Sequence, residues 1–197
     1  MPRVTPLTKN DVLELEEGFA NMEKILGFVP NSNLIMARRP EILKNFQALA
    51  TAIFAAPGIP PDLKVMIGHI ASRAAGCSYC MAHTGHMVEM RGVSPEKLDA
   101  IWNYERDDLF TPGERAALLV AQGASMVPNT VTDADFEELK RHWDEDQVVE
   151  IISVIALYGF LNRWNDTLAT ELEAPPLSFG QERLSDAGWD AGKHAAG

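Results

Sequence analysis

Residues 61–92 read PDLKVMIGHIASRAAGCSYCMAHTGHMVEMRG, and this stretch decides how the chain folds. Residues 62–75 are rich in helix formers and stop at Gly76, a residue type that commonly ends a helix. The segment that follows contains one glycine and no proline up to Met90, so a second helix is expected with Cys77 in its first turn. The stretch therefore predicts two consecutive helices with a pair of cysteines where the second begins.

Helix signals recur along the rest of the chain. Gly27 stands where a helix-terminating glycine belongs, Ser94 and Pro95 form a capped start, and Thr111 with Glu114 forms a capping box. No segment alternates as a half-buried strand does, and no Asn-Gly or Asp-Gly hairpin turn occurs. We therefore predict an all-α fold of seven or eight helices, the others covering residues 10–26, 41–55, 112–124, 132–143 and 144–172 and a short segment from residue 95.

The organisation of the chain is predicted to be one domain with a tail. Residues 1–172 are expected to form a single helical domain around a core at about 61–92. The similar openings PDLK at 61–64 and PGER at 112–115 hint at a duplicated helical unit. The tail, residues 173–197, is expected to be loop-like, and its apolar residues require a surface on the same domain or on a neighbouring subunit.

Composition excludes several classes of partner. The chain carries 17 Lys and Arg against 28 Asp and Glu, a formal net charge of −11, which repels nucleic acid and anionic membranes. The apolar stretch 148–161 is shorter than the roughly 20 residues that cross a bilayer. Because the N-terminus lacks the apolar core of a secretory signal, a cytoplasmic location is expected.

The only two cysteines, Cys77 and Cys80, form a CxxC pair that favours redox chemistry. The N–H groups and positive dipole end of the predicted second helix would face Cys77 and favour its thiolate. At helical spacing Cys80 lies within one turn, close enough for a disulfide. A thiolate that attacks a peroxide becomes a sulfenic acid, which a neighbouring thiol traps as a disulfide.

Three histidines are candidates for proton transfer. His83 lies on the same helical face as Cys80 and is expected to accept the thiol proton or stabilise the thiolate. His86 lies a turn further on, and His69 approaches the cysteines only if the two helices pack as a hairpin. Tyr79, between the cysteines, is an accessory candidate.

The CxxC segment has three other interpretations. Zinc is disfavoured because Cys77, Cys80, His83 and His86 on one helix fan over about 180° and do not converge on one ion. A thioredoxin-like site normally follows a strand, whereas here the preceding segment is helical. A structural bridge, or two inert core thiols in a non-catalytic helical module, stays open.

The sequence resembles the AhpD-like and carboxymuconolactone decarboxylase superfamily, particularly its branch of uncharacterised peroxidase-related proteins. The resemblance spans about residues 30–173 and is carried by PDLK at 61–64, RAAGCSYCMAH at 73–83 and GFLNRWND at 159–166. It implies an all-helical fold assembling into dimers, trimers or hexamers, and a CxxC pair that reduces alkyl hydroperoxides. It also implies that Cys80 attacks and Cys77 resolves, whereas the helix-terminus argument favours Cys77 as the more acidic thiol.

The chain departs from the best-studied AhpD pattern at three positions. Val65, Tyr79 and Thr84 stand where that pattern has a glutamate and two histidines, so the proton relay is absent in that form. We hypothesise that His69, one helical turn after Val65, reaches the space of the relay acid.

The function expected from the sequence is a thiol-dependent peroxidase without metal, haem or flavin. Its partners would be a small hydroperoxide, an unidentified thiol or protein reductant, and further copies of the same chain. The alternatives are a non-catalytic redox-sensing or structural oligomer and, less favoured because both thiols are present, a carboxymuconolactone-type decarboxylase.

Overall fold

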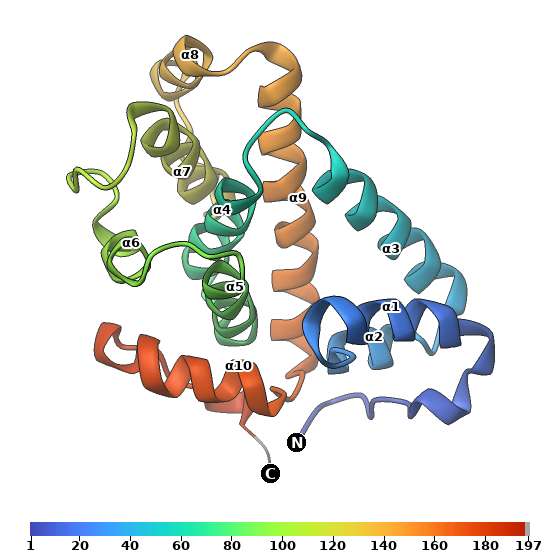
Figure 1. The fold of residues 1–197 in the computed structure, drawn as a ribbon. Coiled ribbons are helices and arrows are strands. Elements are labelled where there is room, and N and C mark those ends of the chain that lie inside the picture. Colours follow the sequence, from blue (N-terminus) through green and yellow to red (C-terminus); the bar gives the residue numbers. More distant parts are fainter. Residues whose placement is uncertain (196–197) are drawn as a thin grey trace.

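The computed structural model describes residues 1–195, and the prediction of an all-α fold is confirmed. These residues contain no strand and form ten α-helices rather than seven or eight (Figure 1). The difference is due to two helices of six residues, α2 and α10, which are too short to give a clear periodicity. The helices are α1 Glu16–Leu26, α2 Asn31–Met36, α3 Pro40–Ala55, α4 Pro61–Ala74, α5 Ser78–Met90, α6 Pro95–Asp99, α7 Pro112–Ser125, α8 Asp133–His142, α9 Glu145–Leu168 and α10 Ala174–Phe179.

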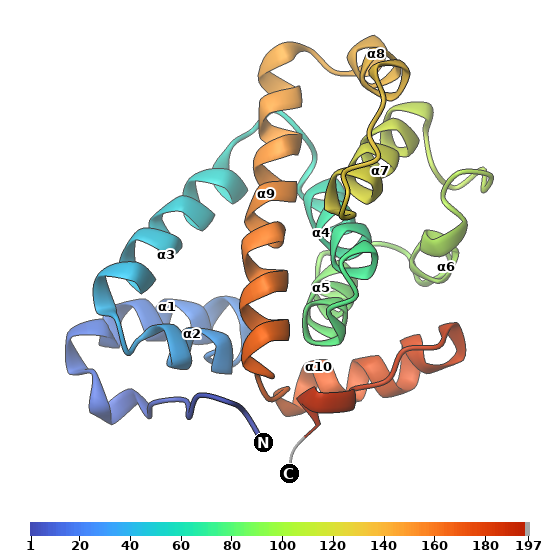
Figure 2. The same ribbon diagram turned by 180° about the vertical axis from the view of Figure 1, so that it is seen from behind.

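The long helix α9 organises the molecule. In both views α4, α5 and α7 lie on one side of it and α3 on the other (Figure 2). The contact between α4 and α9 is close because Gly68 faces the ring of Tyr158, and a Cβ at that position would lie 2.3 Å from the ring. Most of the core lies among α4, α5, α7 and α9, while a smaller cluster lies around α1 and α3. No helix of residues 1–195 is both long and apolar enough to span a bilayer.

The start of α5 differs by one position from the sequence-based expectation. Gly76 adopts a left-handed conformation with φ +71°, which redirects the chain after α4. Cys77 is then extended, with φ −92° and ψ 98°, and serves as the N-cap of α5 rather than as a first-turn residue. Its Sγ accepts a hydrogen bond of 3.4 Å from the backbone N–H of Cys80. The two cysteines are therefore already in contact in the reduced protein.

The C-terminal segment is helical where a loop was expected. Helix α9 ends at Leu168 rather than near residue 172, because Ala169 turns the chain with a left-handed φ of 50°. Helix α10 and the turns after it then pack against α5, which buries Phe179 and Trp189. The expectation of a loop-like tail was wrong. This segment is helical because its apolar residues pack against α5, and its own sequence gives no helix signal. The last two residues of the predicted tail lie outside the described part of the chain.

A buried ion pair joins α4 to α9. Lys64 Nζ lies 2.6 Å from Glu150 Oε1, and the two side chains are 1% and 9% exposed. Lys64 Nζ also donates to the carbonyl of Ile53 at 2.8 Å, and Glu150 accepts from the backbone N–H of Gly58 at 2.9 Å. Burying charges costs free energy unless they are paired and hydrogen bonded, and here both conditions hold.

We expect Lys64→Met to lower the free energy of unfolding by about 3–5 kcal/mol, because it leaves the Glu150 carboxylate buried without its cation. The matched control is Lys44→Met, since Lys44 pairs with Glu41 on the surface and its loss should change stability by about 1 kcal/mol or less. Urea unfolding at neutral pH measures both values. Equal stabilities for the two variants would contradict a stabilising role for the buried Lys64–Glu150 pair.

Candidate functional site

Cys80 opens on an internal cavity of about 150 Å³ between α2, α3, α5 and α9. The walls are mainly apolar, with Leu26, Phe46, Phe54, Met87, Leu157 and Leu161 among the residues that line them. Tyr79, His83, Thr84 and Asn165 supply polar groups beside the thiol. A larger hollow of about 640 Å³ between α3 and α9 is lined by neither cysteine nor histidine, so the smaller cavity is the candidate site.

The two thiols occupy different positions around this cavity. Both cysteines are free and buried, but Cys80 lines the cavity and Cys77 lies behind it at the start of α5. Burial raises the pKa of the Cys80 thiol well above its usual range, and the adjacent Cys77 raises it further. The side-chain amide of Asn165, 3.4 Å away, donates to Cys80 Sγ and acts in the opposite direction. Cys80 therefore needs a base beside it to react as a thiolate.

The histidine next to Cys80 along the cavity wall is paired with an acid from the C-terminal segment. His83 Nε2 lies 2.6 Å from Glu173 Oε2, and both side chains are largely buried. Tyr79 donates its hydroxyl to Glu173 Oε1 at 2.9 Å, and the backbone N–H of Asn31 donates to the same oxygen. Burial alone would raise the pKa of Glu173, but His83 and the backbone N–H of Asn31 outweigh it and lower the pKa. Glu173 is thus an anion held against His83.

The imidazole of His83 is also fixed by aromatic neighbours. It stacks on the ring of Tyr79 with centroids 4.3 Å apart, and the edge contact with Phe28 is at 5.7 Å. Tyr79, an accessory candidate in the sequence, therefore contacts both members of the His83–Glu173 pair.

The other two histidine candidates lie outside the cavity lining. His69 is fully buried, stacks on Trp102 at 4.5 Å and contacts Thr84 Oγ1 through Nδ1 at 2.9 Å. Burial lowers the pKa of His69 to about 3, so its ring is neutral at physiological pH. His86 is half-buried near Phe179. The structure brings Cys80, Tyr79 and His83 together, and His69 reaches the cavity only through Thr84.

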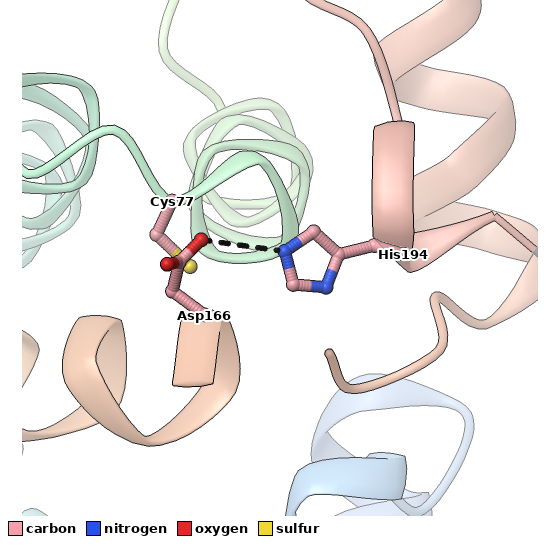
Figure 3. Close-up of side chains that lie close together, drawn as sticks. All are labelled: Cys77, Asp166 and His194. Atoms are coloured by element: carbon pink, nitrogen blue, oxygen red, sulfur yellow. Dashed lines mark ion pairs between the residues drawn. The ribbon is translucent and has the colours of Figure 1, made fainter. Parts of the chain in front are cut away.

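A second polar cluster surrounds Cys77 (Figure 3). The sulfur of Cys77, a carboxylate oxygen of Asp166 at the end of α9 and a ring nitrogen of His194 lie within 4.8 Å of one another. These are metal-ligand types, but Lys193 Nζ lies 2.8 Å from Asp166 Oδ1 and would compete with a metal ion for this oxygen. The cluster is therefore better suited to holding a proton than a metal ion.

Sequence reasoning missed four polar residues of these clusters: Asn165, Asp166, Glu173 and His194. Asn165 and Asp166 lie in the segment GFLNRWND at 159–166. The resemblance of this segment to the family was the one signal for these two residues. Glu173 and His194 belong to a segment without recognisable helix signals, and they meet the cysteines only through tertiary structure.

Comparisons with known proteins place the chain in a family. Residues 40–123 match the family described as Carboxymuconolactone decarboxylase. The crystal structure of the debrominase Bmp8, solved also with 2,3,4-tribromopyrrole in a variant with one cysteine changed to alanine, is 38% identical with a TM-score of 0.86. The match covers 91% of this chain and 96% of Bmp8. The chain belongs to the AhpD-like and carboxymuconolactone decarboxylase superfamily.

More distant relatives are found among solved structures and by sequence. An uncharacterised peroxidase-related protein from Ralstonia eutropha JMP134, with an alkylhydroperoxidase AhpD core, is 24% identical over 91% of this chain and 96% of its own, with a TM-score of 0.78. The uncharacterised protein YnjA of Escherichia coli K12 is 29% identical over 56% of this chain. The chain spans 60% of the length of YnjA.

We expect Glu173→Gln to lower the free energy of unfolding near neutral pH by roughly 1–3 kcal/mol, because a neutral amide leaves buried donors poorly paired. The folded-state pKa of Glu173 lies below its usual value of 4.5, so this stabilisation is present above pH about 4.5 and is lost as the pH falls through the folded-state pKa. Urea unfolding of both proteins between pH 6 and pH 3 measures the difference, which should shrink on acidification.

The control for this comparison is Glu182→Gln, which changes an exposed carboxylate of the same C-terminal segment. Its stability should follow that of the wild type at every pH. A Glu173→Gln difference that stays constant between pH 6 and pH 3 would contradict a buried, ionised Glu173.

Proposed function

We propose that the protein is a thiol-dependent peroxidase that reduces a small organic hydroperoxide with the Cys77–Cys80 dithiol. The observation that carries the proposal is the position of Cys80, which lines an apolar cavity together with His83 of the His83–Glu173 pair, while its backbone N–H donates to Cys77 Sγ. Cys80 is thus the attacking thiol in the proposal and Cys77 the resolving thiol. His69 and His86 have at most indirect parts.

The first half of the proposed cycle forms a sulfenic acid at Cys80. Because burial raises the pKa of Cys80, the thiol keeps its proton until His83 accepts it, and Glu173 stabilises the resulting imidazolium. The thiolate attacks the terminal oxygen of the hydroperoxide and the O–O bond breaks. The leaving alkoxide takes the proton from His83 and departs as an alcohol.

The second half closes the disulfide. Cys77 attacks the sulfur of the Cys80 sulfenic acid, the S–S bond forms, and the hydroxyl group leaves as water with the thiol proton. An external thiol or protein dithiol then reduces the disulfide and restores both cysteines. Per cycle, one hydroperoxide and one external dithiol are converted to alcohol, water and a disulfide.

The similarity to Bmp8 favours a second candidate, reductive removal of bromine from a small aromatic ring. The same thiol chemistry applies, because the Cys80 thiolate takes the bromine from a ring carbon that receives a proton. Cys77 then displaces bromide as the disulfide forms. The aromatic side chains in the cavity wall, Phe46, Phe54 and Tyr158 among them, suit a flat ring.

The test is thiol titration of the reduced protein before and after one equivalent of cumene hydroperoxide or of 2,3,4-tribromopyrrole, with alcohol and bromide measured as products. We expect the wild type to lose both thiols with the preferred substrate and to turn over repeatedly with dithiothreitol. Cys80→Ser should lose substrate reduction by at least about 100-fold. Cys77→Ser should complete one reduction and stop with an oxidised Cys80.

The control for substitution damage is His142→Asn, which changes an exposed histidine far from the cysteines in the sequence and should leave both reactions unchanged. If both thiols survive both compounds, the reductase proposal fails. Oxidation without turnover under reductant would instead identify a redox-sensing module. The expected homo-oligomer and cytoplasmic location stay predictions, which size-exclusion chromatography and cell fractionation can test.

A further inference from the structure

The C-terminal segment places a basic nitrogen next to the resolving cysteine. His194 is 1% exposed, and its Nδ1 lies 2.7 Å from the carbonyl oxygen of Thr170. A carbonyl only accepts hydrogen bonds, so Nδ1 carries the proton and Nε2 has the free lone pair. Nε2 is buried without a hydrogen-bond partner and faces Asp166, and a ring nitrogen of His194 lies within 4.8 Å of Cys77 Sγ (Figure 3).

The carboxylate of Asp166 would stabilise a proton on His194 Nε2. Asp166 Oδ1 lies 3.8 Å from His194 Nε2 and is held on its other side by Lys193 Nζ at 2.8 Å. In the neutral ring the lone pair of Nε2 faces this anion, which is unfavourable, whereas a protonated ring would face it as a cation. His194 and Asp166 can therefore take up one proton together. The Cys77 thiol, which the proposed cycle must deprotonate, lies beside them.

We propose that His194 accepts the proton of Cys77 when the disulfide closes, and that Asp166 is a positioning residue that stabilises the imidazolium. This inference rests on the dithiol cycle proposed above. The Cys77 thiol transfers its proton to His194 Nε2, the thiolate attacks the sulfur of Cys80, and the hydroxide or bromide on that sulfur leaves. The proton on His194 is then given to the leaving hydroxide or to solvent.

Each thiol thus has its own histidine and carboxylate. His83 faces the cavity and is engaged by Glu173, so it is placed to serve Cys80 rather than Cys77. The ring of Tyr79 separates the two histidines, with centroid distances of 4.3 Å to His83 and 5.9 Å to His194. This separation allows attack and resolution to use different bases.

The surroundings of His194 keep it neutral before the reaction. Burial lowers the pKa of His194, which outweighs the opposing effects of the Thr170 carbonyl and Asp166, and Lys193 lowers it further. The groups that face the ring are Cys77, Tyr79, Thr170 and Asp166, besides its neighbour Lys193. A neutral, buried imidazole is the form required to accept a proton.

The first test separates the two halves of the cycle. His194→Asn keeps a side-chain donor for the Thr170 carbonyl but removes the basic nitrogen, and His142→Asn is the matched control. With one equivalent of cumene hydroperoxide and EDTA-treated protein, trapping with dimedone measures sulfenic acid at Cys80, and mass spectrometry measures the disulfide. We expect sulfenic acid to form at the wild-type rate and the disulfide to form about 100-fold more slowly. Disulfide closure at the wild-type rate would overturn the inference.

A second test does not depend on any substrate. In the Cys80→Ser background, the rate at which methyl methanethiosulfonate modifies Cys77 at pH 7 measures how readily this thiol gives up its proton. His194→Asn should lower this rate about tenfold, because no base beside the thiol then accepts the proton. An unchanged rate would exclude His194 as the proton partner of Cys77, even if the wild type reduced neither substrate and the proposed function failed.

The part assigned to Asp166 is tested by a double-mutant cycle. Asp166→Asn should slow disulfide closure less than His194→Asn does, and it should have little further effect when His194 is already replaced. Additive effects of the two substitutions would indicate that Asp166 acts on stability alone. Thermal unfolding of each variant verifies that the comparison is made between folded proteins.

Discussion

The candidate site depends on the burial of one carboxylate. Glu173 is placed among groups from two separate parts of the chain: the backbone of Asn31 at the start of α2, and the hydroxyl of Tyr79 and the ring of His83 on α5. An isolated buried anion would be strongly unfavourable, so these groups and Glu173 require one another. The segment after α9 consequently holds His83, a residue of the cavity lining, through Glu173, which does not itself line the cavity.

This dependence explains what the sequence could and could not predict. The helix starts at Ser94, Thr111 and Thr132 are local features, because cap and partner lie within four residues, and each was predicted correctly. The end of α9 at Ala169 was not predictable, because a non-glycine residue adopts the left-handed conformation there. Glu173 and His194 escaped recognition because nothing in their immediate sequence distinguishes a buried acid or base from a solvated one.

The environment of the cysteines also revises the comparison with the AhpD pattern. The position of the usual glutamate is Val65, which is fully buried in the hydrophobic core, so no acid can act from that point. Here the carboxylate beside His83 is Glu173, which comes from the segment after α9. Our hypothesis that His69 replaces the relay acid is weakened by its neutral, stacked position behind Thr84. In the proposed cycle, Glu173 supplies the carboxylate that the AhpD pattern has at the position of Val65.

The capping of α5 by Cys77 links the oxidation state of the pair to the backbone. The sulfur that accepts the N–H of Cys80 is the same sulfur that would bond to Cys80 in a disulfide. Side-chain N-caps of Ser, Thr, Asn and Asp contribute about 0.5–2 kcal/mol to helix stability, and a disulfide would draw the Cys77 sulfur toward Cys80 Sγ and away from this N–H. The first turn of α5 is therefore better satisfied in the reduced protein. Folding itself thus favours return to the dithiol, and a reductant acting on this protein would be assisted by the recovery of a helix cap.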